Sequence, residues 1–513
     1  MTVISSEQYL KKILLAPIYE AAIETKLQPL NKLSARLSNH ILLKREDLQP
    51  VHSFKLRGAY NKLANLSDQQ KQNGVIAASA GNHAQGLALS AQKMGLKATI
   101  VMPKTTPDIK INSVRSLGAD VILFGETFDA ANAHSLALAK EHAYTLIHPF
   151  DDPDVIAGQG TIGKELLQQD AHLEKIFVPV GGGGLAAGIA VYIKQLLPHI
   201  QIIAVEPEDA ACLQAALKVG KPTTLSKVGL FADGVAVKTI GKETFRLCQQ
   251  YIDDVVTVSS DEICAAVKDI FDDTRAIAEP AGALALAGLK KYSHQHQLKD
   301  QRLAAILSGA NVNFHGLRYV SERCELGEQN ESILAVTIPE KQGAFLAFCN
   351  ELDGRAITEF NYRYTSAKEA NIFVGIRTPE GFDELSTLTE KLMSVGYSVE
   401  NLSHDETAKL HVRYMVGGVP SHQLTERLYS FEFPEHPNAL LKFLNLLGFH
   451  ANITLFHYRN HGAAYGQVLA GFEINAAQVN EFNQYINTLG FNYKDETNNQ
   501  AYRFFLSPTN NGE

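Results

Sequence analysis

Hydrophobic and polar positions change between two periods along residues 40–205. Short apolar runs that fit β-strands alternate there with segments whose apolar residues recur at helical spacing. The predicted strands are 41–47, 74–80, 98–103, 119–125, 175–181 and 200–207, and the predicted helices include 54–66 and 83–95. Strands that alternate with helices indicate a parallel sheet with helices on both faces, and strands that are apolar throughout fit a sheet buried on both sides. The pattern therefore predicts an α/β fold.

The C-terminal part of the chain contains an internal repeat. Its matching segments are 332–352 with 427–447, 357–363 (ITEFNYR) with 453–459 (ITLFHYR), and 394–407 with 488–497. Because the matches follow one order, we interpret them as a duplication rather than a chance similarity of amphipathic segments. Each copy reads strand, helix, strand, strand, helix, strand, which is typical of ferredoxin-like α+β units.

These two patterns divide the chain. The α/β pattern fades near residue 320, and the polar, glycine-containing segment that follows predicts a linker. We expect an α/β body at 1–322, a linker at 323–331, and α+β modules at 332–418 and 419–513. A chain of 513 residues is long enough for about three domains.

Composition narrows the functional classes. Asp and Glu number 55 against 47 Lys and Arg, and no basic block stands out, which argues against a nucleic-acid or anionic-membrane surface. The longest apolar runs are shorter than the ~18 residues of a membrane helix, and the N-terminus does not follow the pattern of a signal peptide. The five cysteines are widely spaced without a CxxC pair, so neither a disulfide framework nor a structural zinc site is expected. We expect a soluble cytoplasmic protein.

The first motif with candidate chemistry is HSFKLRGA at 52–59, which places Lys55 at the start of a predicted helix. A lysine in such a first turn is most often solvated. If it is buried against a ligand, however, its pKa falls and its amine can form a Schiff base.

Two further motifs each follow a predicted strand and open a helix. SAGNHAQG at 79–86 brackets Asn82 with small residues, so that backbone N–H groups at the helix N-terminus could bind a carboxylate, although an ordinary turn with an Asn cap also fits. VPVGGGGLAAG at 178–188 puts four glycines before a helix, which suits a phosphate but matches neither GxGxxG nor the P-loop. The three motifs together are consistent with one ligand.

With EPAGA at 279–283 and SGAN at 308–311, the three motifs resemble the fold type II pyridoxal-phosphate (PLP) enzymes. Within these the chain is similar to the biosynthetic threonine dehydratases (threonine deaminases), and its repeat resembles their two ACT-like regulatory domains. The resemblance implies a tryptophan synthase β-like catalytic domain at 1–322 followed by tandem ferredoxin-like domains.

The resemblance also implies roles for individual residues. Lys55 would hold the cofactor and act as the base at Cα, Asn82 would bond to the 3′-oxygen, and Ser308 would face the pyridine nitrogen. The phosphate would be bound by Gly181, Gly182, Gly183, Gly184 and Leu185, and the substrate carboxylate would be surrounded by Ser79, Gly81 and His83. A hydroxyl such as that of Ser308 does not hold the ring nitrogen protonated, which favours loss of a β-substituent.

The activity implied by the resemblance is β-elimination from L-threonine to give 2-oxobutanoate and ammonia, the first step of isoleucine biosynthesis. Isoleucine would inhibit and valine antagonise through the C-terminal modules of a homotetramer, although the modules could instead serve assembly alone. Tyr362, Arg363, Tyr458 and Arg459 follow the repeated ITxF segments and are either effector contacts or structural strand residues.

Other activities remain open at this point. A serine-preferring dehydratase, or another β-eliminating or β-replacing enzyme of the same fold, differs by as little as one methyl group in its pocket. Serine racemases carry a hydroxyl residue where this chain has Ala80, which argues against racemisation. Their metal loop resembles 206–212, but Cys212 stands where a carboxylate is expected, so we assign no metal ligand, and Glu206 fits an ordinary strand-end carboxylate equally well. Intact Lys55 argues against a non-catalytic amino-acid sensor.

Overall fold

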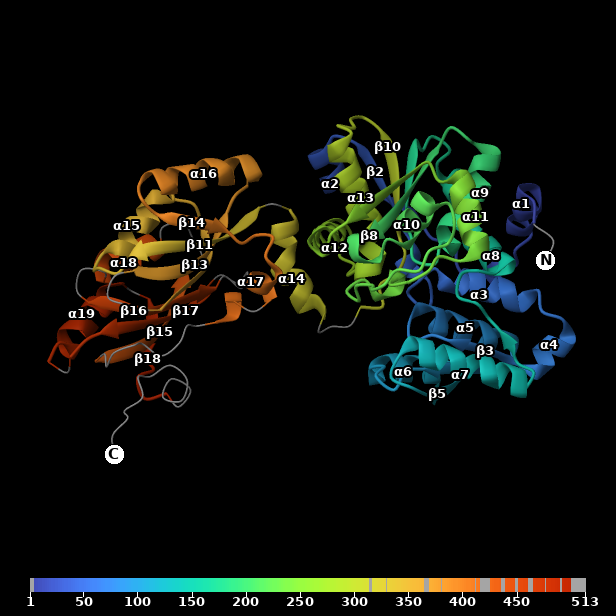
Figure 1. The fold of residues 1–513 in the computed structure, drawn as a ribbon, viewed down its shortest axis with the longest axis horizontal. Coiled ribbons are helices and arrows are strands. Elements are labelled where there is room, and N and C mark those ends of the chain that lie inside the picture. Colours follow the sequence, from blue (N-terminus) through green and yellow to red (C-terminus); the bar gives the residue numbers. More distant parts are fainter. Residues whose placement is uncertain are drawn as a thin grey trace. The chain divides into compact units, whose positions relative to one another are not determined.

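The computed structural model forms two compact units, Met1–Gly327 and Glu328–Glu513 (Figure 1). It describes residues 4–312, 316–328, 330–363, 369–379, 381–410, 412–415, 425–434, 439–447, 451–459, 465–475, 477–489 and 491–499. The boundary expected between residues 418 and 419 lies outside the described residues.

The larger sheet of the first unit has six strands in the order β1-β2-β10-β7-β8-β9. They are β1 (Leu27–Pro29), β2 (His40–Arg45), β10 (Arg302–Leu307), β7 (Lys175–Pro179), β8 (Gln201–Pro207) and β9 (Asp254–Val258). All pairs are parallel except β1 with β2. Consecutive residues face different cores: Ile176 and Val178 pack on the side of α8 and α9, and Phe177 packs on the side of α13. The helices around this sheet are α1 (Ser6–Leu14), α2 (Asn31–Leu37), α8 (Pro153–Gln169), α9 (Gly184–Leu196), α10 (Cys212–Val219), α11 (Lys242–Tyr251), α12 (Ser260–Thr274), α13 (Pro280–Gln295) and α14 (Gly316–Gly327).

A second, four-stranded parallel sheet forms a smaller lobe of the same unit, in the order β5-β4-β3-β6 (Figure 1). Its strands are β3 (Val75–Ala78), β4 (Ala98–Met102), β5 (Asp120–Leu123) and β6 (Thr145–Leu146). The accompanying helices are α3 (Lys55–Ala64), α4 (Asp68–Asn73), α5 (Asn82–Met94), α6 (Asp108–Ser116) and α7 (Phe128–Glu141). The predicted α/β class and its strands are thus confirmed, but the strands divide between two sheets instead of forming one.

The second unit contains the repeat. Its first copy is β11 (Glu331–Pro339), α15 (Ala344–Glu351), β12 (Ile357–Arg363), β13 (Glu369–Arg377), α16 (Phe382–Ser394) and β14 (Ser398–Asn401). Its second copy is β15 (Glu426–Pro434), α18 (Ala439–Leu447), β16 (Asn452–Arg459), β17 (Tyr465–Glu473), α19 (Val479–Leu489) and β18 (Asn492–Asp495), with the short helix α17 (Glu406–Leu410) between the copies. The predicted element order is confirmed in both. Because β12 and β16 pair antiparallel, with Phe360 opposite Tyr458, the copies share one eight-stranded sheet.

The predicted linker 323–331 begins too early. Helix α14 continues to Gly327, and β11 begins at Glu331. The segment is polar in sequence because only a narrow face of α14 packs against the rest of the first unit. Val320 and Cys324 on this face are buried in the core, and Arg323 pairs with Asp261 at 3.1 Å.

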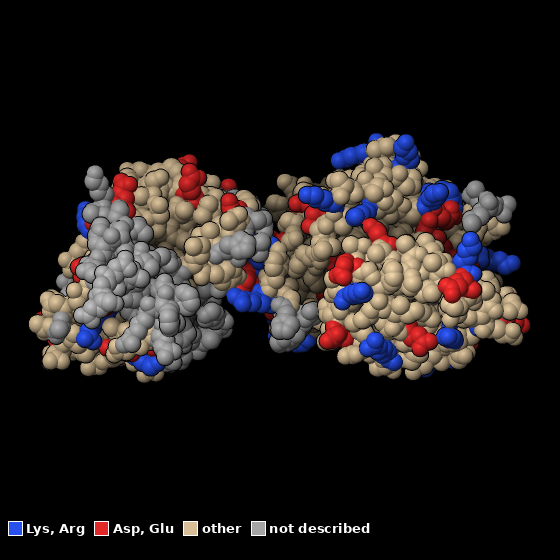
Figure 2. Space-filling view, turned by 60° about the horizontal axis from the view of Figure 1, so that its bottom comes forward, with Lys and Arg blue, Asp and Glu red and all other residues tan. Residues whose placement is uncertain are grey.

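The predictions made from composition concern surface charge, cysteines and membrane helices, and the structure describes all three. On the face drawn in Figure 2, lysines and arginines are interspersed with acidic residues. All five cysteines are buried as free thiols. None of the helices in the described ranges combines the length and the apolar character needed to cross a membrane.

Candidate active site

The first residue of α3 is Lys55, and its side chain is partly buried. Its Nζ donates a hydrogen bond to the carbonyl oxygen of Pro149 at 3.1 Å. Burial lowers the pKa of the Lys55 amine to about 8, although the nearby Glu279 carboxylate opposes this shift. The structure therefore holds an amine that is partly neutral near physiological pH, as a nucleophile or base requires.

The start of α3 is held close to two other elements. A Cβ atom at Gly86 of α5 would lie 2.9 Å from the Leu56 nitrogen and 3.0 Å from the Lys55 carbonyl carbon, so glycine is needed for this approach. On the other element, the Phe54 N–H donates to the Ser308 carbonyl oxygen at 3.2 Å. Ser308 follows β10, is buried, and donates its hydroxyl to the carbonyl oxygen of Ala281 at 3.2 Å. Lys55 and Ser308 thus belong to one site.

Asn82 begins α5 directly after β3 and its carboxamide is fixed at both ends. Its Nδ2 donates to Glu279 Oε1 at 2.6 Å, and its Oδ1 accepts from Asn311 Nδ2 at 2.7 Å. Burial raises the pKa of Glu279 to about 7, against the opposing effect of the Asn82 hydrogen bond. Glu279 and Asn311 were not predicted as site residues, although both lie in the segments 279–283 and 308–311 that carry the resemblance. A glutamate directly before Pro280 fits an ordinary helix N-cap, so the sequence alone carries no signal for this contact.

The three residues predicted around a substrate carboxylate separate into two groups. The Gly81 N–H donates to Ser79 Oγ at 3.3 Å, and a Cβ at Gly81 would meet open space, so this loop leaves room beside Asn82. His83 is instead buried, with Nε2 3.0 Å from the carbonyl oxygen of Ile147. Burial and the charge of Lys55 lower the pKa of His83 to about 3, so the imidazole is neutral and Nε2–H donates to Ile147. The ring of His83 therefore anchors the loop through Ile147.

The glycine loop lies between β7 and α9 and is fully packed. A Cβ at Gly182 would lie 2.2 Å from the ring of Phe150, and Gly183 has a φ of +89°, which favours glycine. The carbonyl oxygen of Gly182 accepts from Thr244 Oγ1 at 2.7 Å. In contrast, the buried backbone N–H groups of residues 181–185 have no acceptor among the described residues. Buried donors without a partner are rare, and at a helix N-terminus they form an anion site.

Short contacts join the glycine loop to the other groups. Pro149, which accepts from Lys55, is adjacent to Phe150, which packs on Gly182. On the other side, a Cβ at Gly234 would lie 3.9 Å from Asn82 Nδ2, and the next residue, Val235, packs on Gly181. The amine of Lys55, the carboxamide of Asn82, the hydroxyl of Ser308 and the anion cradle therefore belong to one connected site. These groups fit a phosphorylated ligand with an aldehyde that an amine can attack.

Glu206, the carboxylate compared above with a metal ligand, instead binds the start of a helix. Glu206 accepts hydrogen bonds from the backbone N–H groups of Leu213 at 2.7 Å and Gln214 at 2.8 Å, and so holds the first turn of α10. Burial raises the pKa of this carboxyl to about 7. In the part of the chain that the structure describes, no group of three or more His, Cys, Asp or Glu side chains could hold a metal ion.

Comparisons with known proteins cover nearly the whole chain. A family model described as pyridoxal-phosphate dependent enzyme matches residues 18–309, and one described as the C-terminal regulatory domain of threonine dehydratase matches 322–412 and 417–506. The biosynthetic L-threonine dehydratase of Escherichia coli strain K12 is 63% identical over 98% of this chain and 97% of its own length. The processed form of threonine deaminase isoform 2 from Solanum lycopersicum is 50% identical, with a TM-score of 0.61, over 62% of this chain and 92% of that chain. Maize serine racemase is 30% identical, with a TM-score of 0.58, over 62% of this chain and 97% of that chain.

Proposed function

The chain belongs to the threonine dehydratases, PLP-dependent enzymes with C-terminal regulatory domains, and from this membership we propose which of its residues deaminate L-threonine to 2-oxobutanoate and ammonia. The observation that carries the assignment is the row of unpartnered N–H groups at 181–185, joined through Phe150 and Pro149 to the amine of Lys55. A phosphate group and an aldehyde on one ligand would satisfy both ends of this arrangement.

Each of these groups has a role in holding the cofactor. The N–H groups of Gly181, Gly182, Gly183, Gly184 and Leu185 would bind its phosphate, and Lys55 would bind it covalently. Asn82 would form a hydrogen bond with the 3′-oxygen. Its carboxamide is held in place for this contact, because Nδ2 donates to Glu279 and Oδ1 accepts from Asn311. The Ser308 hydroxyl would face the ring nitrogen without adding a charge. When bound, PLP supplies an electron-withdrawing ring that acidifies the Cα–H bond of an attached amino acid.

Lys55 is the group that moves the proton. Its pKa of about 8 leaves part of the amine neutral at pH 7 and most of it neutral above pH 8, so it can accept the Cα proton of threonine. The substrate carboxylate would be bound by the loop of Ser79, Gly81 and Asn82, with His83 supporting the loop through Ile147.

Elimination is favoured over racemisation at this site. Racemisation needs a proton donor on the face of Cα opposite Lys55, and the alanine side chain of Ala80 has no proton to give. The similarity to maize serine racemase therefore concerns the fold.

Assay of both candidate substrates tests the proposed function. With PLP-loaded enzyme, kcat/KM for 2-oxobutanoate release from threonine should exceed that for pyruvate release from serine by about tenfold or more, the effect of one methyl group in a fitted apolar pocket. Faster turnover of serine would reject threonine as the substrate and support the serine-preferring alternative.

We further propose that isoleucine inhibits the enzyme and that valine antagonises it, both through the second unit. Both copies of the regulatory domain are present, and a small cavity lies between the two repeats. Its lining includes Glu340 and Tyr362 from the first copy and Leu444 and Ile453 from the second, with the Tyr362 hydroxyl donating to Glu340 Oε1 at 2.7 Å. The cavity has a volume of about 30 Å³, so isoleucine would enter only if the lining side chains move apart; the apolar wall with a carboxylate at one side would then suit an aliphatic amino acid.

Removal of the second unit after Gly327 is the corresponding test. The first unit has its own hydrophobic cores, so we expect the fragment to deaminate threonine without inhibition by isoleucine, whereas the full chain is inhibited and valine relieves the inhibition. Initial rates over a range of isoleucine concentrations measure this. A fragment that is still inhibited would place the effector site in the first unit.

The remaining proposals concern the cellular compartment and the oligomeric state. We propose a cytoplasmic homotetramer, as in the family. The five buried free thiols are consistent with a reducing compartment.

A further inference from the structure

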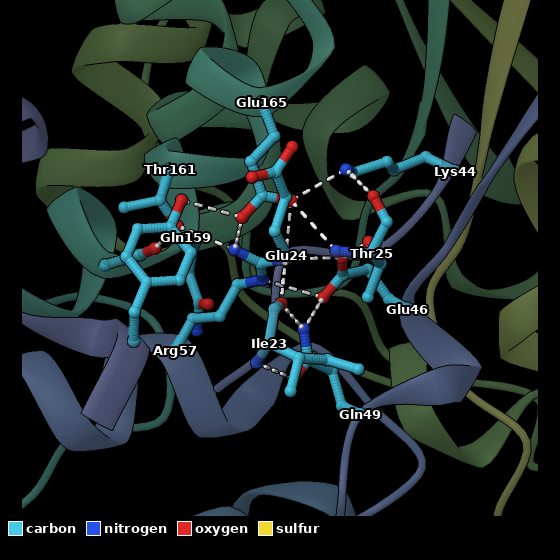
Figure 3. A network of polar contacts seen from close by, with 12 residues as sticks. Ile23, Glu24, Thr25, Lys44, Glu46, Gln49, Arg57, Gln159, Thr161 and Glu165 are labelled. Carbon is cyan, nitrogen blue, oxygen red and sulfur yellow. Dashed lines mark hydrogen bonds and ion pairs between the residues drawn. The ribbon is translucent and has the colours of Figure 1, made fainter. Parts of the chain in front are cut away.

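Two residues after Lys55, helix α3 carries an arginine that is fully buried. Arg57 lies in a closed group of four charged side chains with Lys44 of β2, Glu46 of the 3-10 turn η2 (Glu46–Leu48), and Glu165 of α8 (Figure 3). We call these four residues the Arg57 cluster. None of the four side chains is exposed to solvent.

The guanidinium of Arg57 connects both carboxylates. Its Nε and Nη2 donate to the two oxygens of Glu46, each at 2.7 Å, and its Nη1 and Nη2 donate to Glu165 at 2.5 and 2.9 Å. Lys44 Nζ lies 2.6 Å from Glu165 Oε2, so two cations balance two carboxylates. The side chains of Tyr19, Thr25 and Gln49 donate further hydrogen bonds to the two carboxylates. Thr161 Oγ1 accepts from Arg57, and the Thr25 carbonyl oxygen accepts from Lys44.

The cluster and the Lys55 amine lie on opposite sides of the first turn of α3. Residues two apart on a helix are separated by about 200° around its axis. On the side of Lys55, the backbone of α5 at Gly86 contacts Lys55 and Leu56. On the side of Arg57, the guanidinium ties the same turn to η2 and to α8. The turn is therefore fixed from both sides.

Stability alone does not explain this cluster. A buried ion pair is often replaced by apolar side chains without loss of stability, because removing charges from water is costly. A guanidinium group adds a geometric restraint that apolar packing lacks, because its planar donors fix the positions and angles of two carboxylates at once.

We propose that Arg57 is a positioning residue that sets the place of the Lys55 amine in the site. By holding the first turn of α3 against η2 and α8, it keeps Nζ next to the Pro149 carbonyl. The inference rests on the proposed role of Lys55 in the reaction.

The test compares Arg57→Lys, which keeps the charge but loses the fork, with Ile270→Ala, which opens a cavity in α12 in a different core. In the cofactor-free protein, acylation of Lys55 by acetic anhydride is followed against pH by mass spectrometry, with exposed Lys140 as the internal reference. We expect a midpoint near pH 8 in the wild type and in Ile270→Ala. In Arg57→Lys the midpoint should move toward the ~10.4 of an ordinary lysine.

The loaded enzyme gives a second readout. We expect kcat for threonine to fall by about 10²-fold in Arg57→Lys, with little change in KM, because a small displacement of a reacting group has this effect. If Arg57→Lys does not fold, Glu46→Gln replaces it, since it keeps the shape of the cluster while weakening one side of the fork.

An unchanged Lys55 midpoint, with kcat no lower than in Ile270→Ala, would overturn the inference. That result leaves the proposed function intact as long as Lys55→Ala is inactive. Full activity of Lys55→Ala would instead contradict the proposed function itself.

Discussion

Lys55→Ala is expected to lose at least ~10⁴-fold in kcat for 2-oxobutanoate release from threonine. The amine of Lys55 is both the covalent attachment point and the base in the proposed mechanism, so one substitution removes both functions. The cradle at 181–185 is untouched, and the variant should still bind PLP without a covalent link. Turnover of threonine, with cofactor content measured after gel filtration, checks both parts.

Lys62→Met is the matched control. Lys62 lies on the same helix, and its Nζ pairs with Asp152 at 2.8 Å outside the site. We expect its activity to stay near that of the wild type. Activity of Lys55→Ala within about tenfold of the wild type would rule out Lys55 as the base.

Gly182→Ala should weaken PLP binding by roughly ten- to a hundredfold, the effect of 1–3 kcal/mol of overpacking. The added Cβ would lie 2.2 Å from the ring of Phe150, so the ring or the loop must move. Phe150 adjoins Pro149, which accepts from Lys55, and its displacement disturbs the amine as well as the phosphate cradle. Fluorescence titration of the cofactor-free protein with PLP measures the dissociation constant.

Two further variants test whether weaker PLP binding by Gly182→Ala comes from the contact with Phe150. Gly163→Ala adds the same atom in a buried helix, where its nearest neighbour would be 3.4 Å away, and should bind PLP normally. Phe150→Ala combined with Gly182→Ala removes the clash and should recover part of the affinity. Unchanged binding in the single Gly182→Ala variant would contradict the placement of the phosphate at this loop.

Local patterns predicted the elements of the first unit but not their division into two sheets. The strands VIAA of β3 and KIFVP of β7 look alike in sequence because each is buried on both faces. Which sheet a strand joins depends on pairing between distant segments, as when Ile41 of β2 pairs with Leu303 of β10. The pairing of β12 with β16 is of the same kind, and a repeat in sequence does not reveal whether its copies share a sheet.

In the candidate site, too, some residues stand out in the sequence and others do not. Lys55, Asn82 and the glycine loop are candidates from sequence because their residue types and their places next to predicted strands and helices carry a signal. Pro149 and Phe150 carry none, because a backbone carbonyl and a packed ring are defined only by what the fold brings to them. Arg57 belongs with them, since in SFKLRGA it looks like a solvated arginine and is in fact fully buried.

The central claim is that Lys55 carries the cofactor, and the most direct measurement is to locate the attachment. The wild-type enzyme loaded with PLP is reduced with borohydride, digested and mapped by mass spectrometry. We expect one phosphopyridoxyl group per chain, on the peptide that contains Lys55. A label on a different lysine, or an active enzyme that gives no label, would contradict it.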